Sequence, residues 1–158
     1  MSSAAGKRPA QADPRPRSAG VAPRLFVYGS LRKALGHEMH HVLARAAHFL
    51  GHATVRGALY DLGAYPGLVT AAAGAGLVSG EVYLLAAETA EATLTILDAY
   101  EGCARSDPEP QEYRREVVPV SFDDDTEGEA WTYVLNRPHA GLPRIPGGDY
   151  VAWRRRGG

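Results

Sequence analysis

Short apolar segments that end in glycine-rich or polar turns limit the fold of this chain more than any other feature. By length and composition, five of these segments are typical of β-strands: Arg24–Tyr28, Ala53–Asp61, Leu77–Leu85, Glu112–Phe122 and Glu129–Asn136. The last two flank the polar segment Asp123–Gly128 and predict a β-hairpin. Between the earlier segments, Gly63–Gly67 is rich in turn-forming residues and predicts a loop.

Two further segments have the apolar spacing of amphipathic helices. They are Gly36–Leu50 and approximately Thr89–Tyr100, with Thr89 at the expected N-cap and Gly102 at the expected stop. Strands outnumber helices and include a hairpin. The predicted fold is therefore α+β, a small curled or closed sheet with two main helices.

Length and composition exclude several classes of protein. A chain of 158 residues buries roughly two-thirds of its unfolded surface, so it folds without a disulfide or a metal. Cys103 is the one cysteine, which excludes an intrachain disulfide. The net charge of −1 argues against a nucleic-acid binder, and no run of 18 apolar residues predicts a membrane span.

The two ends of the sequence differ from its centre. Residues 1–22 are rich in Ala, Pro, Ser and Arg and are expected to be a disordered lead-in, whereas residues 154–158 form a basic tail. The lead-in has no apolar stretch typical of a secretory signal. It also resembles an organelle transit peptide, but its prolines oppose an amphipathic helix, so a cytoplasmic location is expected. The domain is then expected to span residues 23–153.

A glycine-containing turn follows the first predicted strand, at Tyr28, Gly29, Ser30 and Leu31. Such a turn can direct successive backbone N–H groups into one concavity, which suits a carboxylate or a phosphate. An ordinary turn at the end of a strand is the simpler interpretation of the same residues.

Glu101 lies at the end of the second predicted helix. At 100° per residue it falls within about 60° of Ala90, Leu94 and Leu97, so it continues the apolar face. Burial and the C-terminal helix dipole would both raise its pKa towards neutrality, as a proton-transferring carboxylate requires. The alternative is a frayed last turn with Glu101 in water.

A third candidate site is the motif His37-Glu38-Met39-His40-His41, which matches H-E-x-x-H. On a helix, His37 and His41 would share a face and bind zinc, with Glu38 as the base of a hydrolase. The third ligand of the extended motif is missing, because Ala47 occupies its position. A solvated helix start rich in histidine is the simpler interpretation. Cys103 has no histidine nearby in the sequence and is interpreted as a packing residue.

Taken together, these segments resemble the γ-glutamylcyclotransferase-like superfamily, which includes the AIG2-like proteins. The resemblance runs in order through Phe26–Arg32, His48–Gly51, Gly57–Leu62, Tyr65–Val69, Gly80–Tyr83, Leu97–Gly102, Tyr113–Arg115, Ala130–Val134 and Gly148–Tyr150.

This resemblance implies a small mixed β-barrel with two main flanking helices. It also implies a cofactor-independent release of 5-oxoproline from a small-molecule γ-glutamyl amide. Glu101 would be the general acid and base, Tyr28–Leu31 would bind the γ-glutamyl end, and Tyr133 would add a hydroxyl. No metal or nucleic acid is implied. The leaving amine and the oligomeric state are left open, and a silent binding module of the same fold is a further alternative.

Overall fold

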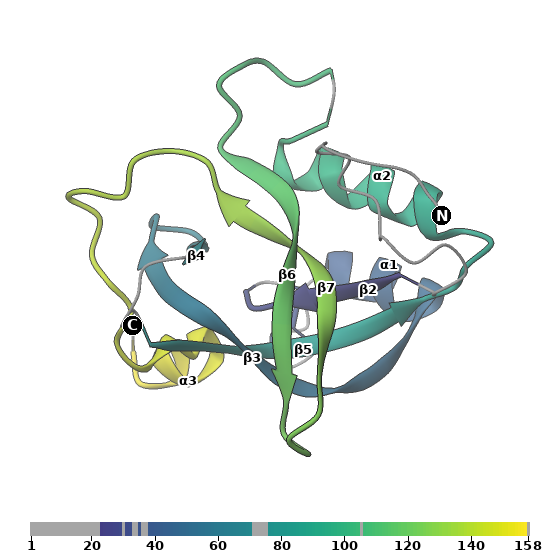
Figure 1. Ribbon diagram of the computed structural model, residues 1–158. Coiled ribbons are helices and arrows are strands. Elements are labelled where there is room, and N and C mark those ends of the chain that lie inside the picture. The colour runs from purple at the N-terminus through teal and green to yellow at the C-terminus, as the bar shows by residue number, and fades with distance from the viewer. Residues whose placement is uncertain are drawn as a thin grey trace, which may run out of the picture.

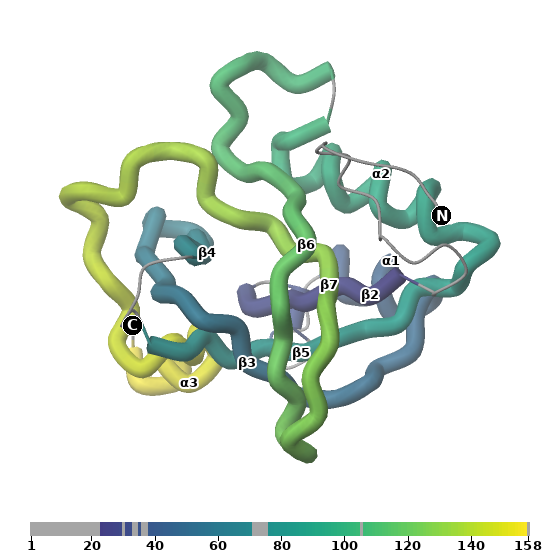
Figure 2. The backbone as a smooth tube through the Cα atoms, viewed as in Figure 1, coloured from purple at the N-terminus to yellow at the C-terminus, as the bar shows by residue number. Residues whose placement is uncertain are grey.

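The computed structural model describes residues 23–29, 31–32, 35, 38–70, 76–104 and 106–157, and Figures 1 and 2 show the course of the chain. The expected lead-in, residues 1–22, lies outside the described residues. The elements are β2 (Arg24–Val27), α1 (Glu38–Ala46), β3 (Ala47–Asp61), β4 (Pro66–Thr70), β5 (Leu77–Leu85), α2 (Ala90–Glu101), β6 (Tyr113–Phe122), β7 (Glu127–Leu135), the 3₁₀ turn η2 (Pro146–Gly148) and α3 (Tyr150–Arg155).

Five of the strands close into a ring. Antiparallel pairs join β2 to β5, β5 to β3, β3 to β6 and β6 to β7, and a short parallel contact between Leu25 and Trp131 returns from β7 to β2. Strand β4 pairs with both β3 and β7. The predicted α+β barrel with mixed pairing is therefore confirmed.

After Arg24, strand β2 is an apolar run, Leu25–Val27, that is covered on both faces. Leu25 and Val27 belong to the apolar cluster that includes residues of α1 and α2. Phe26 and Tyr28 point the other way, into a second cluster built from the barrel strands. Alternate residues of a strand face opposite sides, so a strand between two apolar layers reads as an uninterrupted apolar run.

The helices lie outside the barrel. Helix α2 packs against α1 and lies across one end of the sheet, while the short α3 lies near β3 on another side (Figure 1). Thr89 occupies the predicted N-cap position of α2, although its side chain makes no capping hydrogen bond. Gly102 ends the helix in the left-handed conformation, with φ of 75°, as predicted.

The prediction of one helix over Gly36–Leu50 was wrong at its end. Helix α1 stops at Ala46, and β3 begins at Ala47. The apolar spacing continues to Leu50, but Ala47–Phe49 pair with β5, and these backbone hydrogen bonds outweigh the helical pattern. Phe49 and Leu50 are exposed, so their spacing does not mark a buried helical face.

The sequence-based prediction missed two elements, β4 and α3. Pro66 and Gly67 were predicted to belong to a loop, yet they begin β4, which pairs with β3 and buries Leu68 completely. The predicted basic tail, residues 154–158, starts inside α3, whose N-cap is Asp149. Both elements are short, and their stability comes from contacts with distant segments, which local patterns do not reveal. Among the described helices, none combines the length and the apolar character needed to cross a membrane.

Candidate active site

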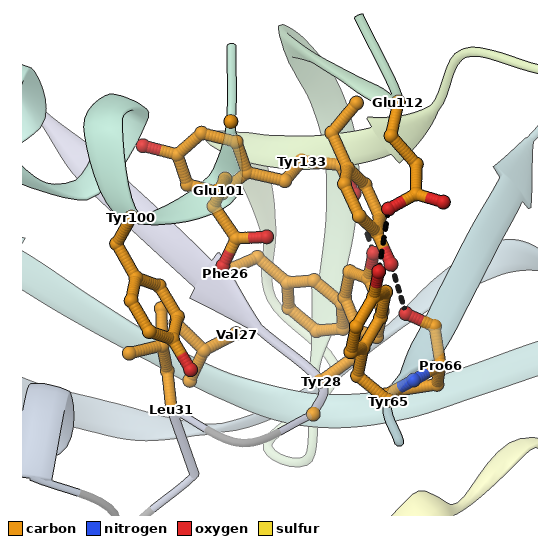
Figure 3. A pocket seen from close by; sticks show the side chains of 13 residues that line it. Phe26, Val27, Tyr28, Leu31, Tyr65, Pro66, Tyr100, Glu101, Glu112 and Tyr133 are labelled. Carbon is orange, nitrogen blue, oxygen red and sulfur yellow. Dashed lines mark hydrogen bonds between the residues drawn. The ribbon is translucent and has the colours of Figure 1, made fainter. Parts of the chain in front are cut away.

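A pocket of about 360 Å³ opens where the end of α2 meets β2, β7 and the loop before β4. Its lining residues are Phe26, Val27, Tyr28, Gly29, Leu31, Tyr65, Pro66, Tyr100, Glu101, Gly102, Glu112, Tyr113 and Tyr133. Figure 3 shows these side chains around the cavity. The structure therefore brings Glu101 together with the turn after β2 and with Tyr133, residues far apart in the sequence.

Glu101 enters the pocket from the last turn of α2. Ala90, Leu94 and Leu97 are buried on the same helical face, which confirms the predicted position of Glu101 on the apolar side. Its carboxyl group points into the cavity (Figure 3). Burial, then the negative charges of Asp98 and Glu112, raise the pKa of Glu101 to about 7. A carboxyl group with this pKa can accept and release a proton near neutral pH.

The turn after β2 forms the facing wall of the pocket. The Arg32 amide donates to the Gly29 carbonyl at 3.0 Å, and Leu31 is buried with its side chain on the cavity. Gly29 lies against the Pro66 ring, since an added Cβ would sit 2.9 Å from Pro66 Cγ. Ser30, a predicted binding residue, lies outside the described residues.

Tyr28 supports the floor of the pocket through its hydroxyl group. This hydroxyl donates to the Tyr133 carbonyl at 2.6 Å and accepts a hydrogen bond from the Leu68 amide at 3.2 Å. Burial, then the charge of Glu101, raise the pKa of Tyr28 far above its ordinary value, so the hydroxyl stays neutral. The side chain thus joins β2, β4 and β7 directly beneath the cavity.

Asp98 lies one helical turn before Glu101 and has three polar contacts. The Arg115 guanidinium donates to its two oxygens at 2.8 and 3.2 Å. The Tyr133 hydroxyl donates to Oδ1 at 2.7 Å. Arg115 also stacks on the Trp131 ring, with its central carbon 4.4 Å from the ring centroid. The Tyr133 ring lines the pocket, but its hydroxyl proton is used by Asp98, which the sequence-based role for this hydroxyl did not foresee.

A further group of polar side chains on the pocket wall was missed by sequence reasoning. The Tyr65 hydroxyl donates to Glu112 Oε1 at 2.6 Å, and Arg137 donates to Oε2 at 3.1 Å. The Tyr113 hydroxyl donates to the Pro66 carbonyl at 2.6 Å (Figure 3). These residues come from loops and strand ends, where periodicity carries no signal. The segments that contain Tyr65 and Tyr113 were part of the family resemblance, but nothing in them pointed to the cavity.

In the histidine motif, the structure shows a hydrogen bond from His40 to the backbone instead of the zinc ligands that the motif suggested. His37 lies outside the described residues, and His41 is exposed on α1. His40 is buried, and its Nδ1–H donates to the Leu31 carbonyl at 2.9 Å. In the described part of the chain, no group of three or more His, Cys, Asp or Glu is placed to hold a metal ion.

Cys103 follows the end of α2 and packs against the apolar cluster beneath that helix. Burial, then the charges of Asp98 and Glu101, raise the pKa of its thiol to about 12. A thiol with this pKa is a poor nucleophile at neutral pH, which agrees with its interpretation as a packing residue.

A family profile and two relatives of known sequence are similar to this chain. The sequence profile of the family described as "Gamma-glutamyl cyclotransferase, AIG2-like" matches residues 25–152. The gamma-glutamylcyclotransferase family protein YtfP of Escherichia coli K12 is 38% identical over 129 residues, which are 81% of this chain and 96% of that protein. The Citrobacter rodentium protein of the same name is 37% identical and is covered to 95%.

Two solved structures have a similar fold. The uncharacterized protein PH0828 of Pyrococcus horikoshii has a TM-score of 0.59 at 29% identity, over 86% of this chain and 96% of that one. An AIG2-like protein of Mus musculus has a TM-score of 0.62 at 24% identity, over 82% of this chain and 88% of that one. The mouse structure shows the likeness of fold alone.

Proposed function

The chain belongs to the gamma-glutamyl cyclotransferase, AIG2-like family, and we propose that it converts a γ-glutamyl amide into 5-oxoproline and a free amine or amino acid. One observation carries the proposal. A carboxyl group with a pKa of about 7, that of Glu101, shares a cavity with the turn after β2. An intramolecular aminolysis needs such a group together with hydrogen-bond donors for the substrate, and the backbone of the turn is the proposed source of these donors.

In the proposed reaction, the nucleophile and the electrophile belong to one molecule. The substrate's α-nitrogen attacks its own γ-carbonyl carbon, the new N–C bond closes a five-membered ring, and the bond to the leaving nitrogen breaks. No electrons are gained or lost, so the balance requires no cofactor. The protein contributes by holding the substrate in a folded conformation that places the two reacting atoms in contact.

Two protons must move from the α-nitrogen to the leaving nitrogen, and Glu101 can carry both. The ionised carboxylate takes the first from the substrate's α-ammonium group before attack and gives it to the leaving nitrogen as the bond breaks. The regenerated carboxylate then takes the second from the nitrogen of the new ring and passes it to the released amine, which departs as an ammonium ion. A pKa of about 7 populates both forms near neutrality.

The turn after β2 is the proposed binding element for the substrate's α-carboxylate. No Lys or Arg is among the described residues that line the pocket, so backbone N–H groups are the natural donors to an anion there. They are also the preferred donors to the oxyanion that develops on the γ-carbonyl. The hydroxyl of Tyr133 is a weaker candidate for this second role because it already donates to Asp98.

The test is Glu101→Gln, assayed for 5-oxoproline release from a panel of γ-glutamyl amides that differ in the leaving amine. Gln keeps the size of the side chain but cannot exchange the proton, so turnover should fall about 10²–10⁴-fold with binding largely kept. The matched control is Glu91→Gln, at the exposed far end of the same helix, which should behave as the unaltered protein. Normal turnover by Glu101→Gln would refute the proposed role.

The same assay, combined with metal analysis of the purified protein and treatment with EDTA, separates the alternatives. A zinc-dependent hydrolase would contain stoichiometric zinc and lose activity with EDTA, whereas the proposed reaction is insensitive to the chelator. A binding module without turnover would bind a γ-glutamyl amide and release no 5-oxoproline at any enzyme concentration. The substrate that reacts fastest in the panel would identify the leaving group.

A further inference from the structure

A cluster of charged side chains lies behind the turn after β2, and all of it is buried except Asp149, whose side chain is 36% exposed. Arg32 is 7% exposed and Glu81, on β5, is 4% exposed. Arg32 Nε donates to Glu81 Oε2 at 3.4 Å, and Arg32 Nη1 donates to Asp149 Oδ1 at 2.9 Å. The Tyr83 hydroxyl donates to the other oxygen of Glu81 at 2.9 Å. None of these four side chains lines the pocket.

The turn is held at three points, and each contact comes from a different element. Gly29 lies against Pro66 at the start of β4. The Leu31 carbonyl accepts from His40 on α1. The side chain of Arg32 reaches Asp149 and β5 on its far side. Because Gly29 and Leu31 also line the cavity, the contacts of Arg32 are one residue away from the pocket wall.

Gly148, the residue before Asp149, lets the chain pass close to β5 and so places Asp149. Gly148 has a φ of 68°, and a Cβ at this residue would lie 2.1 Å from the Leu77 carbonyl oxygen. Only glycine permits the chain to pass so close to β5 in this conformation. Asp149 then accepts two hydrogen bonds at Oδ1, from Arg32 and from the Ala152 amide at 3.1 Å, so one oxygen caps α3 and holds the turn.

From these contacts we infer that Arg32 and Asp149 are positioning residues of the active site. The segment at the start of α3 would set the geometry of the substrate-binding turn without touching the substrate. This inference rests on the proposed function, because it assigns the turn to substrate binding.

The energetics of ion pairs support a geometric role for the cluster. Removing charges from water offsets most of the attraction within a buried pair such as Arg32 and Glu81, and solvent screens the pair with the more exposed Asp149, so both pairs add little net stability. Their donors and acceptors must nevertheless meet in one arrangement. A guanidinium held between two carboxylates therefore restricts where the backbone of Arg32 can lie.

The experiment separates the two hydrogen bonds that Asp149 Oδ1 accepts. Ser is a good N-cap but is too short to reach Arg32, so Asp149→Ser keeps the cap of α3 and removes the contact with Arg32. Asp149→Asn keeps an oxygen at the same position and removes only the charge. Asp124→Ser is the matched control, since Asp124 accepts from the Thr126 amide at 3.0 Å in the exposed hairpin.

For the reaction with the best γ-glutamyl amide, we expect Asp149→Ser to raise KM about tenfold while kcat changes less than about twofold. Asp149→Asn and Asp124→Ser should keep KM within about twofold of the unaltered protein. A KM of Asp149→Ser equal to that of the unaltered protein would overturn the inference. Equal damage by Asp149→Asn would also overturn it, because charge and not the contact would then be responsible.

A second measurement does not depend on activity. The Arg32 amide donates to the Gly29 carbonyl, so its hydrogen exchange reports on the order of the turn. Exchange at Arg32 should be about tenfold faster in Asp149→Ser than in Asp149→Asn. Unchanged exchange would refute the coupling. Should no γ-glutamyl amide react with the unaltered protein, the proposed function fails, while this exchange measurement still decides whether Asp149 holds the turn.

Discussion

The Tyr133 hydroxyl donates a hydrogen bond of 2.7 Å to the Asp98 carboxylate, three residues before Glu101 on α2. Arg115 donates to the same carboxylate through two nitrogens. These contacts hold a negative charge close to the pocket, where it adds to burial in raising the pKa of Glu101. Asp98 therefore tunes the proposed proton-transfer group, and Arg115 and Tyr133 fix its position.

Asp98→Asn should lower the pKa of Glu101. The variant removes a negative charge that favours the protonated form, and it leaves the positive charge of Arg115 without its partner. Because the reaction begins with ionised Glu101, we expect the rising limb of kcat/KM near pH 7 in the unaltered protein and at lower pH in the variant. The pH profile of 5-oxoproline release measures this, with Glu91→Gln as the control. A limb that stays in place, or moves to higher pH, contradicts the tuning role.

Tyr133→Phe tests how the hydroxyl of this residue is used. Since its proton is donated to Asp98, we expect kcat to fall less than about tenfold, well below the roughly 10²–10³-fold loss that follows removal of an oxyanion donor. The free energy of unfolding should fall by about 1–3 kcal/mol, as expected for the loss of a hydrogen bond to a charged group. Steady-state kinetics and urea unfolding separate the two roles. A loss of kcat above 10²-fold would restore Tyr133 as an oxyanion donor.

Glu101 shows which part of the site the sequence alone could predict. Its angular position relative to Leu94 and Leu97 follows from helical geometry, so its place on the apolar face of the helix was predictable without knowing the rest of the fold. The other polar residues that line the cavity are different. Tyr65, Glu112 and Tyr113 reach the cavity only because the barrel closes, and no local pattern describes closure between distant segments.

The same distinction explains the errors in the fold. Leu77–Leu85 was predicted with its observed bounds, since its composition and its turns agree with its pairing. The segment around Phe49 and Leu50 was predicted as helix because its spacing continues that of α1. There the antiparallel pairing with β5 decides the structure, and the exposed apolar side chains give a misleading signal.

Gly29→Ala should damage the pocket by steric conflict with Pro66. The added methyl carbon would lie 2.9 Å from Pro66 Cγ and 3.1 Å from Cδ, so the turn or β4 must shift. We expect a loss of about 1–3 kcal/mol in the free energy of unfolding, typical of overpacking, together with a raised KM.

The control for this prediction is a compensating variant. Pro66→Ala removes the ring atoms that meet the new methyl group, so the double variant Gly29→Ala/Pro66→Ala should recover stability and KM relative to Gly29→Ala. Urea unfolding and kinetics of the two single variants and the double variant complete a double-mutant cycle. Strictly additive effects would show that the two residues do not meet in the folded protein.

Glu101→Gln should also change how stability depends on pH. In the unfolded chain Glu101 has its ordinary pKa of 4.5, whereas in the folded protein its pKa is about 7. Between these values the folded state binds more protons than the unfolded state, so the folded state loses stability as the pH rises. The loss amounts to at most about 3 kcal/mol and is complete above the folded pKa.

Gln does not titrate, so the variant lacks this dependence. Its free energy of unfolding, measured in urea, should therefore rise relative to that of the unaltered protein between about pH 4.5 and about pH 7. Outside this window the difference should be constant, and Glu91→Gln should show no such trend. Parallel curves for Glu101→Gln and the unaltered protein would mean that Glu101 ionises as freely in the folded protein as in the unfolded chain. In that case its carboxyl could not serve as both acid and base near neutral pH.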